Sequence, residues 1–418
     1  MNKTAAVIAE YNPFHKGHEY QIQETRRLTG ANYILVVMSG NFVQRGEPAI
    51  FEKSVRTRMA LLCGADLVLE LPVPYASASA EDFASGAVSL LHRLGVVDYL
   101  SFGSEEGSLI PLKEVSEILS SESPAFSQAL KEALRQGLTF PQARSLALER
   151  CGLSSAALKA ALSSNNLLGI EYLKALSRFS SSIEPITIQR KGSGYHDSSL
   201  SEDPCHYASA SAIRKTMMNS TSGFHVQERF FSHLPENLRS FYQENSFYPL
   251  FPDDCSLLLN YQLLTVLLKN EVLTEFTDFS EELARRLSAM ASQPQTFTQR
   301  IQSLKTRQYT YTRVSRCLLH LMLNHKASHM AQFHREGYPS YARVLGFRRD
   351  AAPLLRKIKE NSQLPLITKA AKASSQLEGT SALIWEQEIY ASHLYHALVF
   401  QKHGISLPNE YSRPLVIL

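Results

Sequence analysis

Two histidines that lie three residues apart, His15 and His18, are the most specific chemical signal in this chain of 418 residues. They flank Gly17 and follow the apolar run 5–9, and the residues after them have the pattern of a helix start. Backbone N–H groups at a helix N-terminus favour an anion, and a glycine there lets a phosphate come close. Each imidazole can also donate a hydrogen bond to a phosphoryl oxygen. The pattern predicts a phosphate site; the alternative is a loop in which both histidines are solvated or packed.

A second region is unusual for its charges. Residues 283–335 contain no aspartate or glutamate, although the chain has 39 acidic residues. The basic residues of this segment are Arg285, Arg286, Arg300, Lys305, Arg307, Arg313, Arg316, Lys326 and Arg335. Basic side chains bind phosphates and tyrosines can stack on unpaired bases, which favours RNA as the partner. The alternative is an ordinary solvated helix face. The predicted RNA contacts are Lys305, Arg307, Arg313 and Arg316.

The elements that position the two histidines alternate between strand and helix. Strands are predicted at residues 5–9, 33–38, 66–71 and 98–102. Helices are predicted from residue 17, at 53–63 and at 81–94. This βαβ alternation predicts an α/β fold with a parallel, doubly wound sheet, which binds ligands beyond the carboxyl ends of its strands. The histidine motif follows the first of those ends.

Helical patterns dominate the remainder of the chain. Residues 109–168 are predicted to be mostly helical, followed by a helix at 166–179 and a strand at 185–189. A further helix opens at Ser209, where hydroxyl side chains can cap it. Residues 219–223 are the expected boundary between an α/β domain, residues 1–220, and a mostly helical region, residues 221–418.

Composition restricts the class of protein. A hydrophobic content of 44% and a charged content of 20% are ordinary for a soluble globular protein. The net charge is only +4, so a nucleic-acid role must depend on a local patch. No apolar run reaches the roughly 20 residues of a membrane span, and the first strand begins too early to leave room for a signal peptide. The five scattered cysteines predict reduced thiols in a cytoplasmic protein, without a zinc site or a disulfide.

Several strings occur in an order that resembles the bacterial tRNA(Met) cytidine acetate ligase family, within the His-x-Gly-His nucleotidyltransferase superfamily. The strings are residues 10–18, 37–49, 102–105, 165–169, 189–190, 195–197 and 211–214, and the likeness extends over 305–316. The resemblance implies a Rossmann-like nucleotidyltransferase domain that binds ATP, followed by a mostly helical region that binds tRNA.

The resemblance also implies a reaction in two steps. Acetate attacks the α-phosphate of ATP, which gives acetyl-adenylate and pyrophosphate. The N4 amine of the wobble cytidine of elongator tRNA(Met) then takes the acetyl group and releases AMP. Mg²⁺ is expected to accompany ATP, and no acetyl-CoA and no obligate protein partner are implied.

The implied site includes His15 and His18 as catalytic residues. The ATP-binding residues implied are Val7, Ile8, Ala9, Glu10, Tyr11, Asn12, Pro13, Phe14, His15, Lys16, Gly17, His18, Glu19, Tyr20, Gly103, Asn165 and Arg190. Gly103 would allow adenosine to come close, and Arg190 would clamp a phosphate or the adenine side, unless it is a surface arginine on an edge strand. The doublet Asn165-Asn166 leaves the register open, with Asn165 preferred.

Hydroxyl and basic side chains elsewhere in the chain are further candidates for ligand contact. Ser209, Ser211 and Arg214 resemble an element that caps a helix against the γ-phosphate in related transferases, here interrupted by an alanine. Arg45 and Lys53 are candidates for acetate or pyrophosphate; the alternatives are a loop cation and a helix-start lysine.

Two carboxylates at strand ends are candidates for metal binding. Glu70 and Glu105 follow strands and are candidates for Mg²⁺, although a salt-bridged structural carboxylate explains each as well. His196 and Asp197 receive no role, and the metal ligands are not identified.

Two other functions remain open. One is a small-molecule adenylyltransferase. This function would share the histidine motif but would not explain the acid-free segment. The other is a non-catalytic RNA-binding protein that keeps ATP as a structural ligand.

Overall fold

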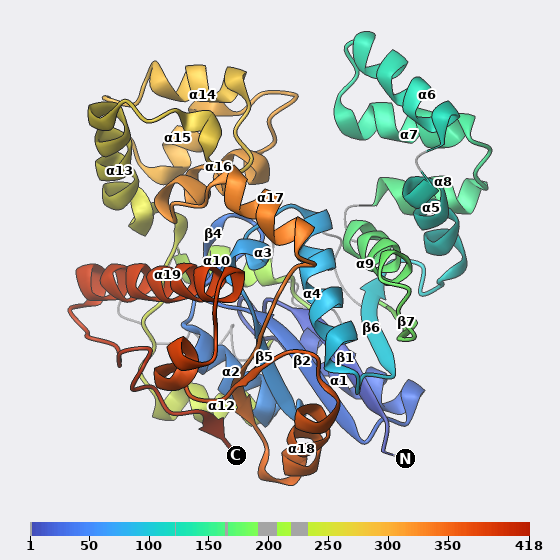
Figure 1. Cartoon of the computed structure of the whole chain (residues 1–418), viewed down its shortest axis with the longest axis vertical. Helices are drawn as coiled ribbons and strands as arrows, with labels where there is room; N and C mark the ends of the chain where they lie inside the picture. Colours follow the sequence, from blue (N-terminus) through green and yellow to red (C-terminus); the bar gives the residue numbers. More distant parts are fainter. Residues whose placement is uncertain (1, 122, 164–165, 191–206, 219–232) are drawn as a thin grey trace.

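A sheet of eight strands forms the centre of the molecule (Figure 1). The computed structural model describes residues 2–121, 123–163, 166–190, 207–218 and 233–418. The strand order there is β10-β8-β5-β2-β1-β6-β7, and β9 pairs with β8. The strands are β1 (Thr4–Ala9), β2 (Tyr33–Ser39), β5 (Leu67–Leu71), β6 (Tyr99–Ser104), β7 (Glu184–Gln189), β8 (Ala342–Phe347), β9 (Leu366–Ile367) and β10 (Val416–Ile417).

The strands of the N-terminal half run parallel, which confirms the predicted doubly wound sheet. β1 pairs with β2 on one side and with β6 on the other. The chain therefore adds strands first in one direction from β1 and then in the other. Such a switch point is where open α/β sheets bind ligands, beyond the carboxyl ends of the strands. The loop with His15 and His18 leaves β1 at this point.

Strands from the far end of the chain complete the sheet. β8 pairs antiparallel with β5, and β9 and β10 pair parallel with β8. The region after residue 220 is mostly helical, as predicted, but these three strands were not predicted. β8 is a six-residue apolar run, and periodicity does not separate so short a run from a buried helix segment. The expected boundary at 219–223 lies outside the described residues, and the sheet contains strands from both sides of it.

Helices cover both faces of the sheet, because side chains alternate along each strand. Val7 and Val36 belong to the core on one face, and Ala6 and Leu35 to the core on the other. The helices that pack into the first core are α1 (Lys16–Thr29), α2 (Lys53–Leu62), α10 (Ala210–Met218) and α12 (Glu236–Glu244). Those that pack into the second include α3 (Val73–Ala76), α4 (Ala80–Leu94), α9 (Asn166–Arg178), α17 (Ala327–Arg335), α18 (Ala352–Asn361) and α19 (Thr380–His403).

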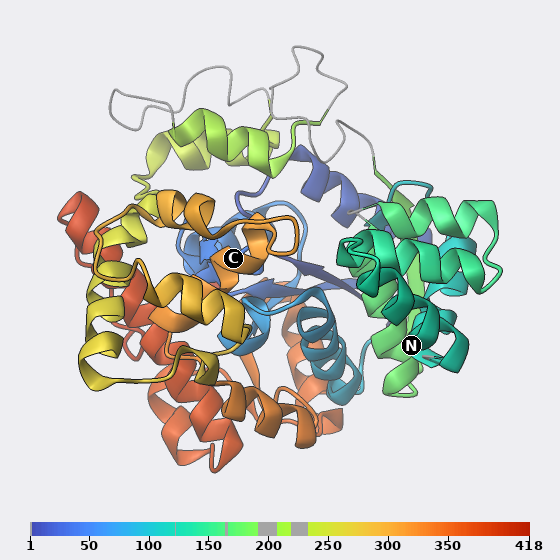
Figure 2. The ribbon, with the colours of Figure 1, turned by 90° about the horizontal axis from the view of Figure 1, so that it is seen from above.

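Two further groups of helices stand on either side in Figures 1 and 2. The first group, in green, is α5 (Ile110–Ser121), α6 (Pro124–Arg135), α7 (Phe140–Arg150) and α8 (Ser155–Leu162). The second, in yellow and orange, is η1 (Pro252–Cys255), α13 (Ser256–Lys269), η2 (Leu273–Glu275), α14 (Glu281–Ser288), α15 (Phe297–Leu304) and α16 (Tyr311–Met322). The second group has its own core, which Phe42 and Tyr395 connect to the rest of the protein.

The remaining elements are short. They are β3 (Phe42–Val43), β4 (Glu47–Pro48), η3 (Arg349–Ala351) and η4 (Ala370–Ser375). None of the helices in the described part of the chain is long and apolar enough to cross a membrane.

Candidate active site

His15 and His18 cap the helix that they begin. His15 is the N-cap of α1, and its Nδ1 accepts a 3.0 Å hydrogen bond from the backbone N–H of Gly17. Nδ1 of His18 accepts a 3.3 Å bond from the backbone N–H of His15. The two bonds form a reciprocal capping box, and the rings stack with their centroids 3.8 Å apart. The side chains of the motif thus bind backbone N–H groups at the start of the helix that it begins.

This capping changes which atoms a ligand can reach. We expected the first N–H groups of α1 to bind phosphate, but the protein already uses them. The N–H of Lys16 donates to the carbonyl of His233 at 3.1 Å, and the N–H groups of Gly17 and His18 donate to His15. Gly17 also differs from expectation, because a Cβ there would lie 2.9 Å from Cε1 of His15. The glycine thus makes room for the imidazole of His15.

The capping bonds determine where the imidazole protons lie. A neutral imidazole has a single N–H, and a nitrogen that accepts a hydrogen bond cannot carry it. Because Nδ1 accepts in both rings, Nε2 carries the proton in both. Burial, with a smaller effect of Arg190, lowers the pKa of His15 to about 3, and burial lowers the pKa of His18 well below its usual value. At pH 7 both rings are therefore neutral, and each presents an Nε2–H donor.

Aromatic side chains hold the ring of His18. The centroid of the Tyr11 ring lies 4.9 Å from that of His18, and the centroid of Phe14 lies 5.5 Å from it. Tyr11 has a φ of 50°, a left-handed conformation that is rare outside glycine and that clusters at functional sites. Both rings are buried, so their packing limits how His18 can turn.

Arginines from two later segments reach the same loop. Arg190, which follows β7, has its Cγ 3.2 Å from the place where a Cβ on Gly103 would lie, so the missing side chain of Gly103 makes room for Arg190. Its charge lowers the pKa of both histidines. Arg214 of α10 donates to the carbonyl of Asn12 at 2.7 Å and pairs with Glu47 at 3.5 Å. The fold thus brings His15, His18, Arg190 and Arg214 together.

The serine element beside Arg214 has a structural role. Ser209 accepts a 3.1 Å hydrogen bond from a backbone N–H in the first turn of α10, which confirms the predicted cap. Ser211 accepts a 3.3 Å bond from Arg214. His196 and Asp197 lie outside the described residues.

The structure also bears on the Asn165-Asn166 doublet. Asn166 is fully buried, and its Oδ1 accepts a 3.1 Å bond from the N–H of Glu105. Its Nδ2 donates to Glu106 and to the carbonyl of Ala160. These bonds tie the loop after β6 to α9 and occupy the amide. Asn165, which lies outside the described residues, therefore remains the candidate for nucleotide contact.

A short hairpin connects the histidine loop to α16. The N–H of Gln44 donates to Glu10 at 2.9 Å, and the hydroxyl of Ser315 in α16 donates to the carbonyl of Gly46 at 2.8 Å. Burial raises the pKa of Glu10, and the charge of Arg45 opposes this effect. Arg45 therefore lies between the site and the helical group that contains the acid-free segment.

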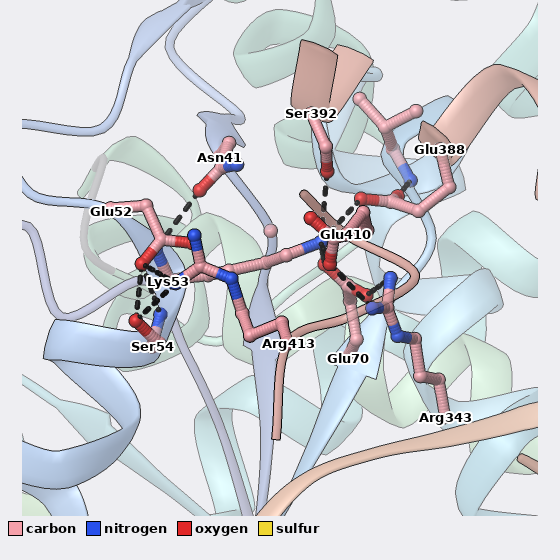
Figure 3. Close-up of polar contacts among 12 residues, drawn as sticks. Asn41, Glu52, Lys53, Ser54, Glu70, Arg343, Glu388, Ser392, Glu410 and Arg413 are labelled. Carbon is pink, nitrogen blue, oxygen red and sulfur yellow. Dashed lines mark hydrogen bonds and ion pairs between the residues drawn. The ribbon is translucent and has the colours of Figure 1, made fainter. Parts of the chain in front are cut away.

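Lys53 and Glu70 lie in a buried ion cluster (Figure 3). Lys53 Nζ is 2.7 Å from Glu70, 3.0 Å from Glu410 and 3.4 Å from Glu388. Arg343, opposite Glu70 in the sheet, pairs with Glu70 at 2.9 Å and with Glu410. The five side chains are at most 7% exposed. Lys53 is thus a helix-start lysine held in buried ion pairs, and Glu70 is a salt-bridged structural carboxylate, which were the alternative interpretations of these two residues.

One carboxyl of this cluster keeps its proton at neutral pH. Burial, followed by the charge of Glu70, raises the pKa of Glu388 to about 8. Its Oε2 accepts a 2.7 Å bond from the N–H of Val73. With Glu388 neutral, Glu70 and Glu410 balance the charges of Lys53 and Arg343.

We expect this proton to make folding stability depend on pH. Between the pKa of an unfolded glutamate, about 4.3, and about 8, the folded protein holds a proton that the unfolded chain has released. The contribution of Glu388 therefore falls as pH rises through this window, by at most about 1.4 kcal/mol per pH unit. Glu388→Gln mimics the neutral carboxyl and should remove this dependence. Urea unfolding of both proteins across the window tests it; a difference between them that does not change with pH would contradict the assignment.

The predicted RNA-binding residues differ in accessibility. Lys305, Arg307 and Arg313 are exposed. Arg316 is only 13% exposed, and its Nε lies 3.1 Å from a carboxylate oxygen of Asp278. The acid-free stretch is therefore neutralised in part by an acid just outside it, and three of the four predicted residues remain on the surface.

Other members of the segment support the fold. Tyr309 is 6% exposed and lies under the guanidinium of Arg313, 5.3 Å from its ring centroid, so it is not presented for stacking on a base. Arg300 is buried and donates to Asn260 at 2.8 Å and to the carbonyl of Gln293 at 2.7 Å.

Sequence reasoning missed four buried charged residues that surround the site or support it. They are Arg56, Arg343, Glu388 and Glu410. One signal was present: Lys53 and Arg56 both lie in the first turn of α2, where the helix dipole disfavours cations. The described residues contain no group of three or more His, Cys, Asp or Glu side chains arranged to hold a metal ion.

Known proteins that resemble this chain identify its family. The model of the HIGH nucleotidyl transferase family matches residues 1–407. A tRNA(Met) cytidine acetate ligase of Thermoanaerobacter sp. (strain X514) is 40% identical over 413 residues, which cover 99% of each chain. A protein of the same name from Acetivibrio thermocellus is 39% identical over 426 residues and covers all of both chains.

Solved structures agree as well. Thermotoga maritima TmcAL bound with alpha-thio ATP superimposes with a TM-score of 0.87 at 28% identity and covers 99% of both chains. Its apo form gives a TM-score of 0.89 at 30% identity and covers 100% of this chain and 99% of that one. The chain therefore belongs to the HIGH nucleotidyl transferase family and, within it, to the family of the tRNA(Met) cytidine acetate ligases.

Proposed function

We propose that the protein is an ATP-dependent ligase that acetylates N4 of the wobble cytidine of elongator tRNA(Met), with acetate as the acyl source. The observation that carries the proposal is the pair of neutral imidazoles whose Nδ1 atoms are bound in the cap, which leaves Nε2–H as the donor of each ring, beside Arg190 at the switch point of the sheet. The T. maritima relative bound with alpha-thio ATP supports a nucleotide as the ligand. The relatives named tRNA(Met) cytidine acetate ligase support the acceptor.

In the first step, an oxygen of acetate attacks the α-phosphorus of ATP. The bond to the β-phosphate oxygen breaks, which gives acetyl-adenylate and pyrophosphate, and negative charge grows on the phosphoryl oxygens. Positioned donors and cations stabilise such charge. The Nε2–H groups of His15 and His18 and the guanidinium of Arg190 supply them here. Because the imidazoles are already fixed by their Nδ1 bonds, they need little reorganisation during the reaction.

In the second step, the N4 amine attacks the acetyl carbonyl carbon. The bond between that carbon and the adenylate oxygen breaks, AMP leaves, and the amine releases one proton to solvent. Acetyl-CoA has no role in this scheme, and Mg²⁺ is expected to arrive bound to the phosphates of ATP. Because tRNA is a cytoplasmic substrate, we propose that the enzyme acts in the cytoplasm without an obligate protein partner.

The experiment that tests the function is incubation with ATP, labelled acetate and bulk tRNA, without coenzyme A. We expect label in cytidine and release of AMP, and neither when ATP is omitted. Absence of label from RNA would overturn the proposal. If a mononucleotide co-substrate then gave a dinucleotide product, the protein would be a small-molecule adenylyltransferase.

We further propose that residues 221–418 provide the tRNA surface through Lys305, Arg307 and Arg313. Lys305→Glu and Arg313→Glu should each weaken tRNA binding and reduce the salt dependence of log K by about one unit per lost phosphate contact. Binding of ATP should not change, because neither residue contacts the histidine loop. Filter binding of tRNA at several salt concentrations measures the affinity and its salt dependence.

The matched control is a charge reversal on the opposite end of the molecule. Lys359 is exposed on α18, which Figure 1 shows far from α14 and α15. Lys359→Glu changes the net charge equally and should leave tRNA affinity almost unchanged. Equal losses in all three variants would show a general charge effect, and no loss in the first two would remove this surface from the proposal.

A further inference from the structure

Arg56 is a fully buried arginine whose partners are backbone carbonyls. It lies in the first turn of α2, and its side chain is 0% exposed. Nε donates to the carbonyl of Phe51 at 2.8 Å. Nη1 donates to Glu10 at 2.6 Å and to Ser39 at 3.0 Å, and Nη2 donates to Gly40. Four of its five N–H groups are thus bound to four different carbonyls.

These carbonyls lie at the edge of the sheet where the candidate site is. Ser39 is the last residue of β2, and Glu10 follows the last residue of β1 directly. The residue after Glu10 is Tyr11, whose left-handed backbone begins the loop to the histidines. The planar fork of one guanidinium therefore fixes the end of β1 relative to the end of β2, and with it the start of the loop.

The charge of Arg56 has no carboxylate in contact. Among the described residues no acid lies within ion-pair distance of it, and burial lowers its pKa from the ordinary arginine value. Burying a cation costs several kcal/mol, which carbonyl dipoles offset only if each points at the guanidinium. A rigid fork also holds several acceptors in one plane, which a lysine ammonium cannot do.

We propose that Arg56 is a positioning residue for the adenylation step. By binding the carbonyls of Glu10, Ser39 and Gly40, it holds the loop so that the Nε2–H groups of His15 and His18 meet the phosphoryl oxygens in the transition state. The inference rests on the proposed function, because it assigns a role within that reaction.

The test compares Arg56→Lys, which keeps the charge, with Arg56→Met, which removes it. The assay is acetate-dependent exchange of pyrophosphate into ATP, expressed per folded protein as measured by near-UV circular dichroism. For Arg56→Lys we expect kcat to fall by about 10²-fold, the order reported for ångström-scale misplacement, with little change in KM for ATP. Arg56→Met should show at least the same loss of kcat.

The matched control is Thr57→Val. Thr57 is also fully buried in α2, and its hydroxyl donates to the carbonyl of Lys53 at 2.8 Å, so the variant loses a buried hydrogen bond without touching the strand ends. It should retain normal kcat and KM.

Each outcome decides the inference. Normal kcat in Arg56→Lys would overturn it. A change confined to KM would indicate a role in binding, and failure of Arg56→Lys to fold would indicate purely structural support, so either result would overturn it as well. Wild-type protein that shows no acetate-dependent exchange would instead refute the proposed function, which keeps the two failures distinguishable.

Discussion

Replacing His18 with asparagine is expected to slow acetate-dependent adenylation by about 10²–10³-fold, the usual effect of removing one oxyanion donor. The amide oxygen of asparagine occupies nearly the place of Nδ1, so it can still accept the N–H of His15 and keep the capping box. It has no atom at the place of Nε2, so the donor to phosphate is lost. The variant therefore separates the two functions of one ring.

The complementary change is His18→Gln, whose amide reaches the place of Nε2 but not that of Nδ1. We expect it to retain more activity than His18→Asn and to lose about 1 kcal/mol of stability through the weakened cap. Pyrophosphate exchange and urea unfolding of both variants measure the two effects. If His18→Asn kept more than half of the wild-type rate, the assignment of Nε2 as the donor would be wrong.

Lys53→Met is expected to cause the largest loss of stability, about 3–5 kcal/mol. Lys53 is 1% exposed and lies among Glu70, Glu388 and Glu410. Removal of the ammonium leaves buried carboxylates without their main counter-charge, because Arg343 alone cannot neutralise both Glu70 and Glu410. Methionine keeps most of the volume, so the loss reports on charge rather than on a cavity.

The control is Lys269→Met on the surface of α13. Lys269 is 62% exposed and lies 3.9 Å from Glu271, so its loss should cost less than about 1 kcal/mol. Free energies of unfolding from urea titration at pH 7 compare the two variants. Equal small losses would mean that the cluster contributes little, and that its charges are better solvated than the contacts indicate.

The histidine loop was predicted in part from its sequence. The residue types and spacing of His15, Gly17 and His18 predicted a helix start at an anion site, and the parallel sheet places the loop at its switch point. The same pattern could not show that the rings themselves cap the helix. That depends on the direction in which each imidazole turns: Tyr11 and Phe14 pack against the ring of His18, and His15 stacks on His18.

Lys53 shows a second limit. Its position at the start of a helix is compatible with an exposed phosphate ligand and with a buried ion pair. The partner Glu388 lies 335 residues away in the chain, and no local pattern links the two. Only the pairing of β8 with β5 and the packing of α19 against α3 bring the charges together.

The sequence by itself determined the parallel α/β core, the position of the candidate site and the kind of ligand it suits, because strand and helix periodicity and residue chemistry are local properties. The tertiary structure alone decided which imidazole nitrogen caps the helix, that Arg56 and Lys53 are buried, and that β8 to β10 join the sheet. These features depend on contacts between segments that lie far apart in the chain, so no single stretch of sequence determines them.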